Sequence, residues 1–332
     1  TTSKVNDLLE QYAQLLLAIE QEEFESPRLQ NWKKSIETNN TNASYRLKEL
    51  AKEIDLLSNR NNMIFAPLAN GFLLWDLRYS YRIEDWIGDF ESALRNWFSI
   101  VERFDAINSF GNFAFNHNSH NYPEVSDSHK NQLYATNLGH PLLNSSTVVK
   151  NSIEVNKKDY FIITGANMAG KSTFLRTVAV NLLLANCGLP VCATTFIYRP
   201  IKLISSMRTS DSLLNDESYF FSELKRLKII VEAIKKEAYF IILDEILKGT
   251  NSKDKAEGSK KFIEKLTLSG STGMLATHDL SICALENKLP QVKNYYFEAT
   301  ILKNELYFDY KFKKGICQNM NASFLLHKMQ II

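Results

Sequence analysis

The stretch TGANMAGKST at residues 164–173 has residue types and a spacing suited to binding phosphate. It matches the pattern GxxxxGKS, in which successive backbone amides surround the phosphates of a nucleoside triphosphate. The lysine of such a loop reaches the β- and γ-phosphates, and the serine hydroxyl binds Mg²⁺. We therefore predict a site for ATP and Mg²⁺ formed by Gly165, Ala166, Asn167, Met168, Ala169, Gly170, Lys171, Ser172 and Thr173.

A second apolar run, AYFIILDE at 238–245, ends in two carboxylates. We expect a buried strand with Asp244 at its carboxyl end, where it would hold Mg²⁺ together with Ser172. Glu245 follows directly and is suited to polarise a water for attack on the γ-phosphate, which favours ATP hydrolysis over a kinase reaction. The alternative for Glu245 is a surface acid that ends a strand.

The run GMLATHD at 273–279 also ends in a side chain that can do chemistry. His278 is suited to hydrogen-bond the γ-phosphate, although an ordinary residue at the end of a strand explains its position equally well. An acid pair, a glycine-bearing loop and a histidine at a strand end follow one another in ABC-type ATPases. We therefore predict catalytic roles for Glu245 and His278.

The elements around these motifs change character along the chain. In the first third, apolar and aromatic residues recur at helical spacing, as from Val5 to Ile19 and from Ile83 to Phe104, and we interpret them as core rather than as a base-stacking platform. From about Tyr134, short strands and helices alternate; YFIITG is typical of a buried parallel strand. The predicted fold is α/β: an ABC-type P-loop NTPase domain at 129–332, preceded by an all-helical domain at 1–128.

Composition narrows the class of protein. The chain has 332 residues, of which 45% are hydrophobic, and a formal charge of +2, so it is globular and not strongly basic. No apolar run reaches membrane-spanning length and no leader opens the chain, so we expect a cytoplasmic protein. Thr1 in place of Met suggests a piece of a longer protein. The four cysteines have no metal-binding spacing and are expected to be reduced, and we interpret His117, His120 and His129 as loop residues, with a metal site as the alternative.

Several motifs together resemble the nucleotide-binding domain of the MutS family of DNA mismatch repair proteins. They are TGANMAGKST, SYFFSELKRL, LDEILKGTNSKDK and ATHD, in the order of that domain, with LGHPLL near its entry and YKFKKGICQNMNASFLLHKM near its end. The Asn-Met pair in the phosphate loop distinguishes them from transporter ATPases, and GANMAGKSTFLRT looks more like a divergent branch than the principal mismatch sensor. IVERFDAINSFGNFAF is similar to the end of the family's lever helices.

The resemblance implies roles that spacing alone does not supply. Ser218 would contact the γ-phosphate held by the other subunit of a homodimer, and residues 251–254 would cross the dimer interface. Without the resemblance, Ser218 is a good helix N-cap. DNA would be the partner, with a downstream repair protein reading the ATP state. The family's mismatch-reading domain and DNA clamp have no counterpart in this chain, and we interpret the basic helix with Lys225, Arg226, Lys228, Lys235 and Lys236 as solvated.

Two other functions stay open. One is an ABC-type ATPase that acts on something other than DNA, for example a transport-associated or membrane-tethered protein. The other is a nucleotide-binding scaffold without turnover, against which Lys171, Asp244 and Glu245 argue.

Overall fold

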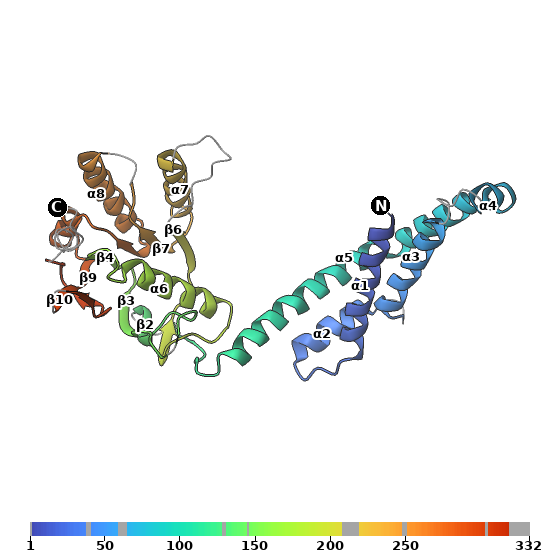
Figure 1. Ribbon diagram of the computed structural model, residues 1–332, viewed down its shortest axis with the longest axis horizontal. Coiled ribbons are helices and arrows are strands. Elements are labelled where there is room, and N and C mark those ends of the chain that lie inside the picture. The colour runs from blue at the N-terminus through green and yellow to red at the C-terminus, as the bar shows by residue number, and fades with distance from the viewer. Residues whose placement is uncertain are drawn as a thin grey trace. The chain divides into compact units, whose positions relative to one another are not determined.

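The chain divides into two compact units, Thr1–Phe113 and Ala114–Ile332 (Figure 1). The computed structural model describes residues 2–37, 41–58, 65–127, 131–144, 146–207, 219–247, 251–302 and 305–318.

The regular elements of the first unit are all helices within its described residues. Ser26 is extended and precedes Pro27 at the first helical turn, the arrangement expected of a helix start because proline there loses no intrahelical hydrogen bond. The helices are α1 (Thr2–Gln21), α2 (Pro27–Ile36), α3 (Ala43–Ser58), α4 (Phe65–Leu73) and α5 (Trp75–Asn116).

The core of the first unit is aromatic. Trp97 is fully buried, and its ring centroid lies 6.3 Å from that of Trp86 and 6.1 Å from that of Phe90. Leu16 of α1, Ile36 of α2 and Leu47 of α3 pack in the same cluster, so four of the described helices share one core. The interpretation of the aromatic stripe as core is confirmed for these rings, because burial leaves no ring face open for stacking on a base.

The second unit is mixed α/β, built on a six-stranded sheet with the order β12-β9-β4-β8-β7-β6. Its neighbouring strands run parallel except β12, which pairs antiparallel with β9. The strands are β4 (Tyr160–Gly165), β6 (Lys202–Ser206), β7 (Tyr239–Asp244), β8 (Thr272–Ala276), β9 (Val292–Phe297) and β12 (Lys313–Lys314).

Two smaller sheets and four helices complete the described part of this unit. One sheet has the order β1-β5-β2-β3, and its strand β1 lies before residue 129, where the predicted ATPase domain begins. The strands are β1 (Glu124–Val125), β2 (Asn131–Leu138), β3 (Asn151–Asn156), β5 (Thr195–Tyr198) and the pair β10 (Ala299–Leu302) and β11 (Glu305–Phe308); the helices are α6 (Lys171–Asn186), α7 (Tyr219–Ala233), α8 (Ser252–Leu268) and the 3₁₀ helix η2 (Leu280–Asn287).

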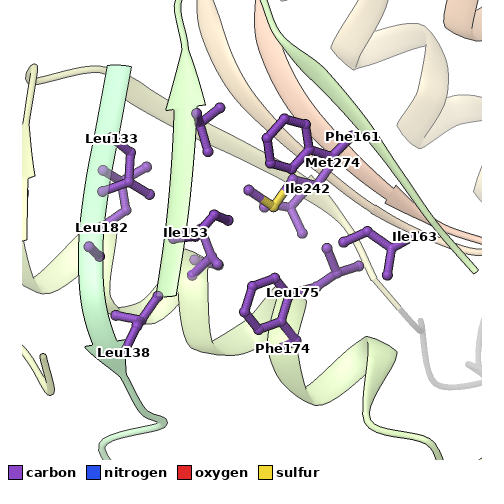
Figure 2. Close-up of a cluster of buried hydrophobic side chains, with 14 of the residues drawn as sticks. Leu133, Leu138, Ile153, Phe161, Ile163, Phe174, Leu175, Leu182, Ile242 and Met274 are labelled. Carbon is purple, nitrogen blue, oxygen red and sulfur yellow. The ribbon is translucent and has the colours of Figure 1, made fainter. Parts of the chain in front are cut away.

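Both faces of the large sheet are buried. Phe161 and Ile163 of β4 point to a core shared with α6 and the β2–β3 pair (Figure 2). Tyr160 and Ile162, the alternate residues, belong to the cluster on the other face, which includes side chains of α7, α8 and η2. Because both faces of β4 are buried, its successive side chains are almost all apolar, which explains the apolar run in its sequence.

No helix in the described ranges is both long and apolar enough to span a membrane. Cys192, Cys283 and Cys317 are buried, Cys187 is exposed, and none of the four forms a disulfide bond.

Candidate active site

The strand order brings three predicted motifs to one edge of the large sheet. β8 lies between β4 and β7, and its last residue, Ala276, is in register with Ile163 of β4 and with Asp244 of β7. Because parallel strands end on the same side, the residues that follow these three positions emerge together. The loop with the phosphate-binding pattern thus follows β4, His278 follows β8, and the acid pair lies at the end of β7.

The loop after β4 has a backbone that requires glycine at two positions. Gly165 has φ 144°, and a Cβ there would lie 2.4 Å from the carbonyl oxygen of Phe297. Gly170 has φ 104° and directly precedes α6, which begins at Lys171. Met168 also has a positive φ, 67°. The loop therefore ends at a helix N-terminus, where exposed amides and the helix dipole favour an anion.

Lys171 is only 5% exposed. Its Nζ donates to the carbonyl oxygens of Gly165 and Ala166, each at 2.8 Å, and lies 3.4 Å from Nε2 of His278. The ammonium group is thus held by the loop that it belongs to, at the centre of the motif. Buried charges require such partners, because an unpaired one loses its hydration without compensation.

Asp244 and Ser172 meet at the end of β7. The Ser172 hydroxyl donates to Oδ1 of Asp244 at 3.0 Å, while Oδ2, in a residue that is 6% exposed, has no hydrogen-bond partner. A carboxylate oxygen without a hydrogen bond, beside a hydroxyl group, is a suitable ligand for a hard cation. Mg²⁺ binds one or two carboxylates and completes its coordination shell with water and phosphate oxygens. The two residues therefore fit the magnesium ion that the sequence predicts.

Glu245 and His278 form an ion-pair contact between neighbouring strands, with 2.8 Å between Oε1 and Nε2. The amide of Glu245 donates to the carbonyl of Ala276, and the amide of Thr277 donates to that of Ile163, so all three strand ends are linked. Glu245 has φ 50°, a left-handed conformation that costs a residue other than glycine about 1 to 3 kcal/mol. The fold therefore holds the backbone of Glu245 in a conformation that this residue type disfavours.

A pocket of about 550 Å³ opens over these residues, a size typical of small-molecule sites. Its polar side includes Lys171, Ser172, Glu245 and His278, and the predicted Asn167, Met168, Gly170 and Thr173 also line it. The other three predicted loop residues, Gly165 and the buried Ala166 and Ala169, do not line it. Six of the nine predicted loop residues therefore border one cavity together with Glu245 and His278.

The sequence analysis missed the other side of this pocket. Val148, Val149 and Tyr310 give it apolar and aromatic surface, and His140 and Arg176 add polar groups. Burial, followed by the nearby Arg176 charge, lowers the pKa of His140 below its usual 6.5. LGHPLL contains His140, but as part of a domain entry it indicated no pocket, and no spacing rule connects Tyr310 to a loop more than a hundred residues earlier.

Two predictions from the family resemblance concern a dimer interface. Ser218 lies outside the described residues, so both its proposed contact across a dimer and its N-cap role stay predictions. Asn251 is described as the N-cap of α8, where its side chain accepts from the amide of Asp254 at 2.9 Å. Its expected role at a dimer interface stays a prediction as well.

Other candidate groups lie outside this pocket. On α7, Lys228 is exposed, which agrees with a solvated basic face, whereas the half-buried Arg226 departs from it and donates to the carbonyl of Ser205. The rings of His117 and His120 lie 4.8 Å apart, and His129 is outside the described residues. Within the part of the chain that the structure describes, no group of three or more His, Cys, Asp or Glu side chains has the arrangement of a metal site.

Comparison with known proteins identifies the relatives of this chain. The MutS protein homolog 4 of Homo sapiens is 29% identical over 193 residues, which cover 55% of this chain and 20% of that protein. The DNA mismatch repair protein MutS of Staphylococcus haemolyticus is 29% identical over 252 residues, covering 72% of this chain and 28% of its own length. The chain thus spans less than a third of these relatives.

The family comparison agrees with the site geometry. The sequence model of MutS domain V matches residues 161–329, which include the loop after β4, the acid pair and His278. Because this match covers just over half of the 332 residues, the chain belongs to the MutS family.

Proposed function

We propose that this chain binds ATP with Mg²⁺ in the pocket above α6 and hydrolyses it to ADP and phosphate. The observation that carries the proposal is the convergence of Lys171, Ser172, Asp244, Glu245 and His278 at the ends of three adjacent parallel strands. The MutS relationship supports ATPase activity at the level of the family. We accordingly interpret the second unit as an ABC-type P-loop NTPase domain.

Each side chain has a distinct task in this proposal. Lys171 and the amides of the loop bind phosphate oxygens, and Ser172 with Asp244 would hold Mg²⁺, which neutralises phosphate charge. Glu245 accepts a proton from the attacking water, and His278 orients the Glu245 carboxylate through their 2.8 Å contact. Val148 and Tyr310 border the apolar end of the pocket, where a nucleotide base fits better than a phosphate.

The first test removes the Lys171 ammonium. Lys171→Ala deletes charge-assisted hydrogen bonds worth about 1.5 to 3 kcal/mol, so ATP should bind roughly 10- to 150-fold more weakly in equilibrium titrations. Lys235→Ala, at an exposed position after α7, is the matched control and should bind ATP as the wild type does. Unchanged ATP affinity in a folded Lys171→Ala protein would remove this lysine from the site.

We further propose that two copies share each site, with Ser218 of one chain serving the nucleotide of the other. Lys171→Ala and Ser218→Arg homodimers should then both be nearly inactive. Mixing them should restore turnover, up to about one working site per heterodimer, because one site combines an intact loop with an intact Ser218. A Ser218→Arg homodimer with normal turnover would contradict the shared site.

The process that this ATPase serves is DNA repair or DNA handling in our proposal, with a downstream repair protein as a further partner. The names of the curated relatives, which include DNA mismatch repair proteins, support this choice. DNA binding releases counterions, so affinity for duplex DNA should weaken steeply as salt rises. ATPase turnover with and without duplex, mismatched and branched DNA would identify the preferred structure.

A second candidate is an ATPase of the same class that acts on something other than DNA. The observation that favours it is the apolar surface of α4 and the start of α5, where Phe72 is 84% exposed and Leu68, Leu73 and Leu77 are exposed as well. Exposed apolar patches mark contacts with proteins or membranes. DNA binding that is absent at low salt, with ATPase activity intact, would favour this candidate.

A further inference from the structure

Glu223 of α7 is a buried carboxylate outside the pocket lining, and no sequence argument gave it a role. It is 6% exposed, and its Oε1 accepts a hydrogen bond from the amide of Leu247 at 2.6 Å. Leu247 is two residues after Glu245, the proposed catalytic base. The Glu223 carboxylate therefore connects α7 to the segment 245–247, which carries the proposed base Glu245.

The segment 245–247 is held in an unfavourable backbone conformation. Glu245 has φ 50° and Leu247 has φ 58°, both left-handed. A residue other than glycine keeps such a conformation only where its surroundings enforce it. A shift of this short segment would therefore also move the Glu245 carboxylate.

Three contacts supply that enforcement. The Glu245 amide donates to the carbonyl of Ala276 on β8, which fixes the start of the segment. The Glu223 carboxylate accepts from the Leu247 amide, which fixes its end, and amide-to-carboxylate hydrogen bonds are stronger than neutral ones. The Leu247 side chain packs so closely against α8 that a Cβ on Gly258 would lie 2.9 Å from it.

We propose that Glu223 is a positioning residue that sets the Glu245 carboxylate for hydrolysis and makes its geometry depend on α7. The inference rests on the proposed ATPase function and adds a means of regulation to it. Ser218, expected to contact the nucleotide of the other subunit, lies five positions before Glu223 in the sequence. A displacement of α7 would thus shift Glu245 of the same chain through the hydrogen bond between Glu223 and Leu247.

The direct test compares three variants by steady-state kinetics. Glu223→Ala removes the acceptor and should lower kcat about 10- to 100-fold, since small displacements of a catalytic group cost this much, while KM and ATP affinity stay within about twofold. Glu223→Gln keeps a carbonyl oxygen and should retain kcat within about threefold. Glu232→Ala removes an exposed carboxylate from the same helix and should match the wild type.

Two measurements keep this test decisive. Hydrogen exchange in the peptide that contains residues 245–247 should be faster in Glu223→Ala than in Glu232→Ala, whether or not turnover is measured. If Glu223→Ala does not fold, Glu223→Asp, which shortens the side chain by one carbon, should show the same selective fall in kcat. A folded Glu223→Ala or Glu223→Asp protein with wild-type kcat overturns the proposal.

Mixed dimers locate the effect in one chain. Adding Glu223→Ala to the Ser218→Arg chain, which keeps the working loop and Glu245, should abolish the recovery seen on mixing with Lys171→Ala. Adding it to the Lys171→Ala chain should leave the recovery intact, and the opposite result overturns the proposal. A wild-type protein without ATPase activity would instead refute the proposed function, and slow exchange at 245–247 in Glu223→Ala would refute the positioning contact separately.

Discussion

Among the described residues, Ser44 is the one polar residue buried in the first unit, whereas the second unit buries all the others, including Lys171, Glu223 and Asp244. Backbone strain is divided in the same way. Among the described residues of the first unit other than glycine, Leu74 alone has a left-handed backbone. In the described part of the second unit, six residues other than glycine have one: Asn137, Lys158, Met168, Glu245, Leu247 and Tyr310. Three of the six, Met168, Glu245 and Tyr310, line the pocket.

This difference shows what each unit requires of its sequence. Apolar side chains at helical spacing are enough to fold the first unit, because its core consists of packed rings and aliphatic groups. The second unit keeps buried charges and left-handed residues that reduce stability unless their neighbours compensate. Such exceptions to local preference are expected at functional sites.

The strongest test of this contrast exchanges one acid in each unit for its amide. Glu245→Gln should lower ATP turnover by about 10²- to 10⁴-fold and leave ATP affinity and the melting temperature nearly unchanged, since the amide keeps the size but accepts no proton. Glu102→Gln, at an exposed position of α5, should change neither. Turnover at the wild-type rate in Glu245→Gln would mean that the base lies elsewhere.

The second test reverses the roles of the units. Trp97→Ala empties a fully buried position of the first unit and should lower the free energy of unfolding by about 3 to 5 kcal/mol. ATP affinity should not change, because the described residues that line the pocket all belong to the second unit. Denaturant unfolding followed by tryptophan fluorescence, with ATP titration of the folded protein, measures both; a loss of affinity equal to the loss of stability would contradict the separation.

A smaller effect is expected at the strained residue of the first unit. Leu74 joins α4 to α5 with φ 47° and is exposed. Leu74→Gly removes a conformational cost of about 1 to 2 kcal/mol and adds the entropy cost of glycine, so stability should rise by about 0.5 to 1 kcal/mol with turnover unchanged. Thermal unfolding checks the sign, and a fall in turnover would show that strain in the first unit also serves the reaction.

The smallest effect concerns pH. Burial and the Arg176 charge lower the pKa of His140 below 6.5 in the folded protein, so the unfolded chain binds this proton first as pH falls. Stability should therefore decrease from pH 7.5 to 5.5, and the decrease should be smaller in His140→Gln, which does not titrate. Equal decreases in melting temperature would contradict the assignment; His120, whose pKa is also lowered, is present in both proteins and cancels.

Sequence reasoning succeeded where chemistry is encoded locally. The strand that ends at Gly165, the loop and the helix from Lys171 are contiguous in the sequence, and Gly188, with φ 76°, follows the end of that helix, a position that favours glycine. It did not identify α4, because Pro67 and Gly71 are poor helix formers and the helix is apolar on several sides.

It also failed where a contact joins distant segments. The bond between Glu223 and Leu247 and the contribution of Tyr310 to the pocket depend on how strands and helices pack, and no periodicity in the sequence reports that. Likewise, the pairing of Glu245 with His278 follows from the position of β8 between β4 and β7, which the sequence does not state. The sequence predicted that Asp244 and Ser172 lie together, because both belong to known motifs, but it did not predict the partners of Glu223 and Tyr310.

The position of β8 has a consequence for synthesis of the protein. β4 and β7 are hydrogen-bonded to β8 and not to each other, although β8 follows both in the sequence. A growing chain that already contains the phosphate loop and the acid pair cannot complete the sheet between them until Thr272–Ala276 has left the ribosome. Until then the edges of β4 and β7 that pair with β8 have unpaired backbone amides and carbonyls, and such edges are sites of wrong strand pairing.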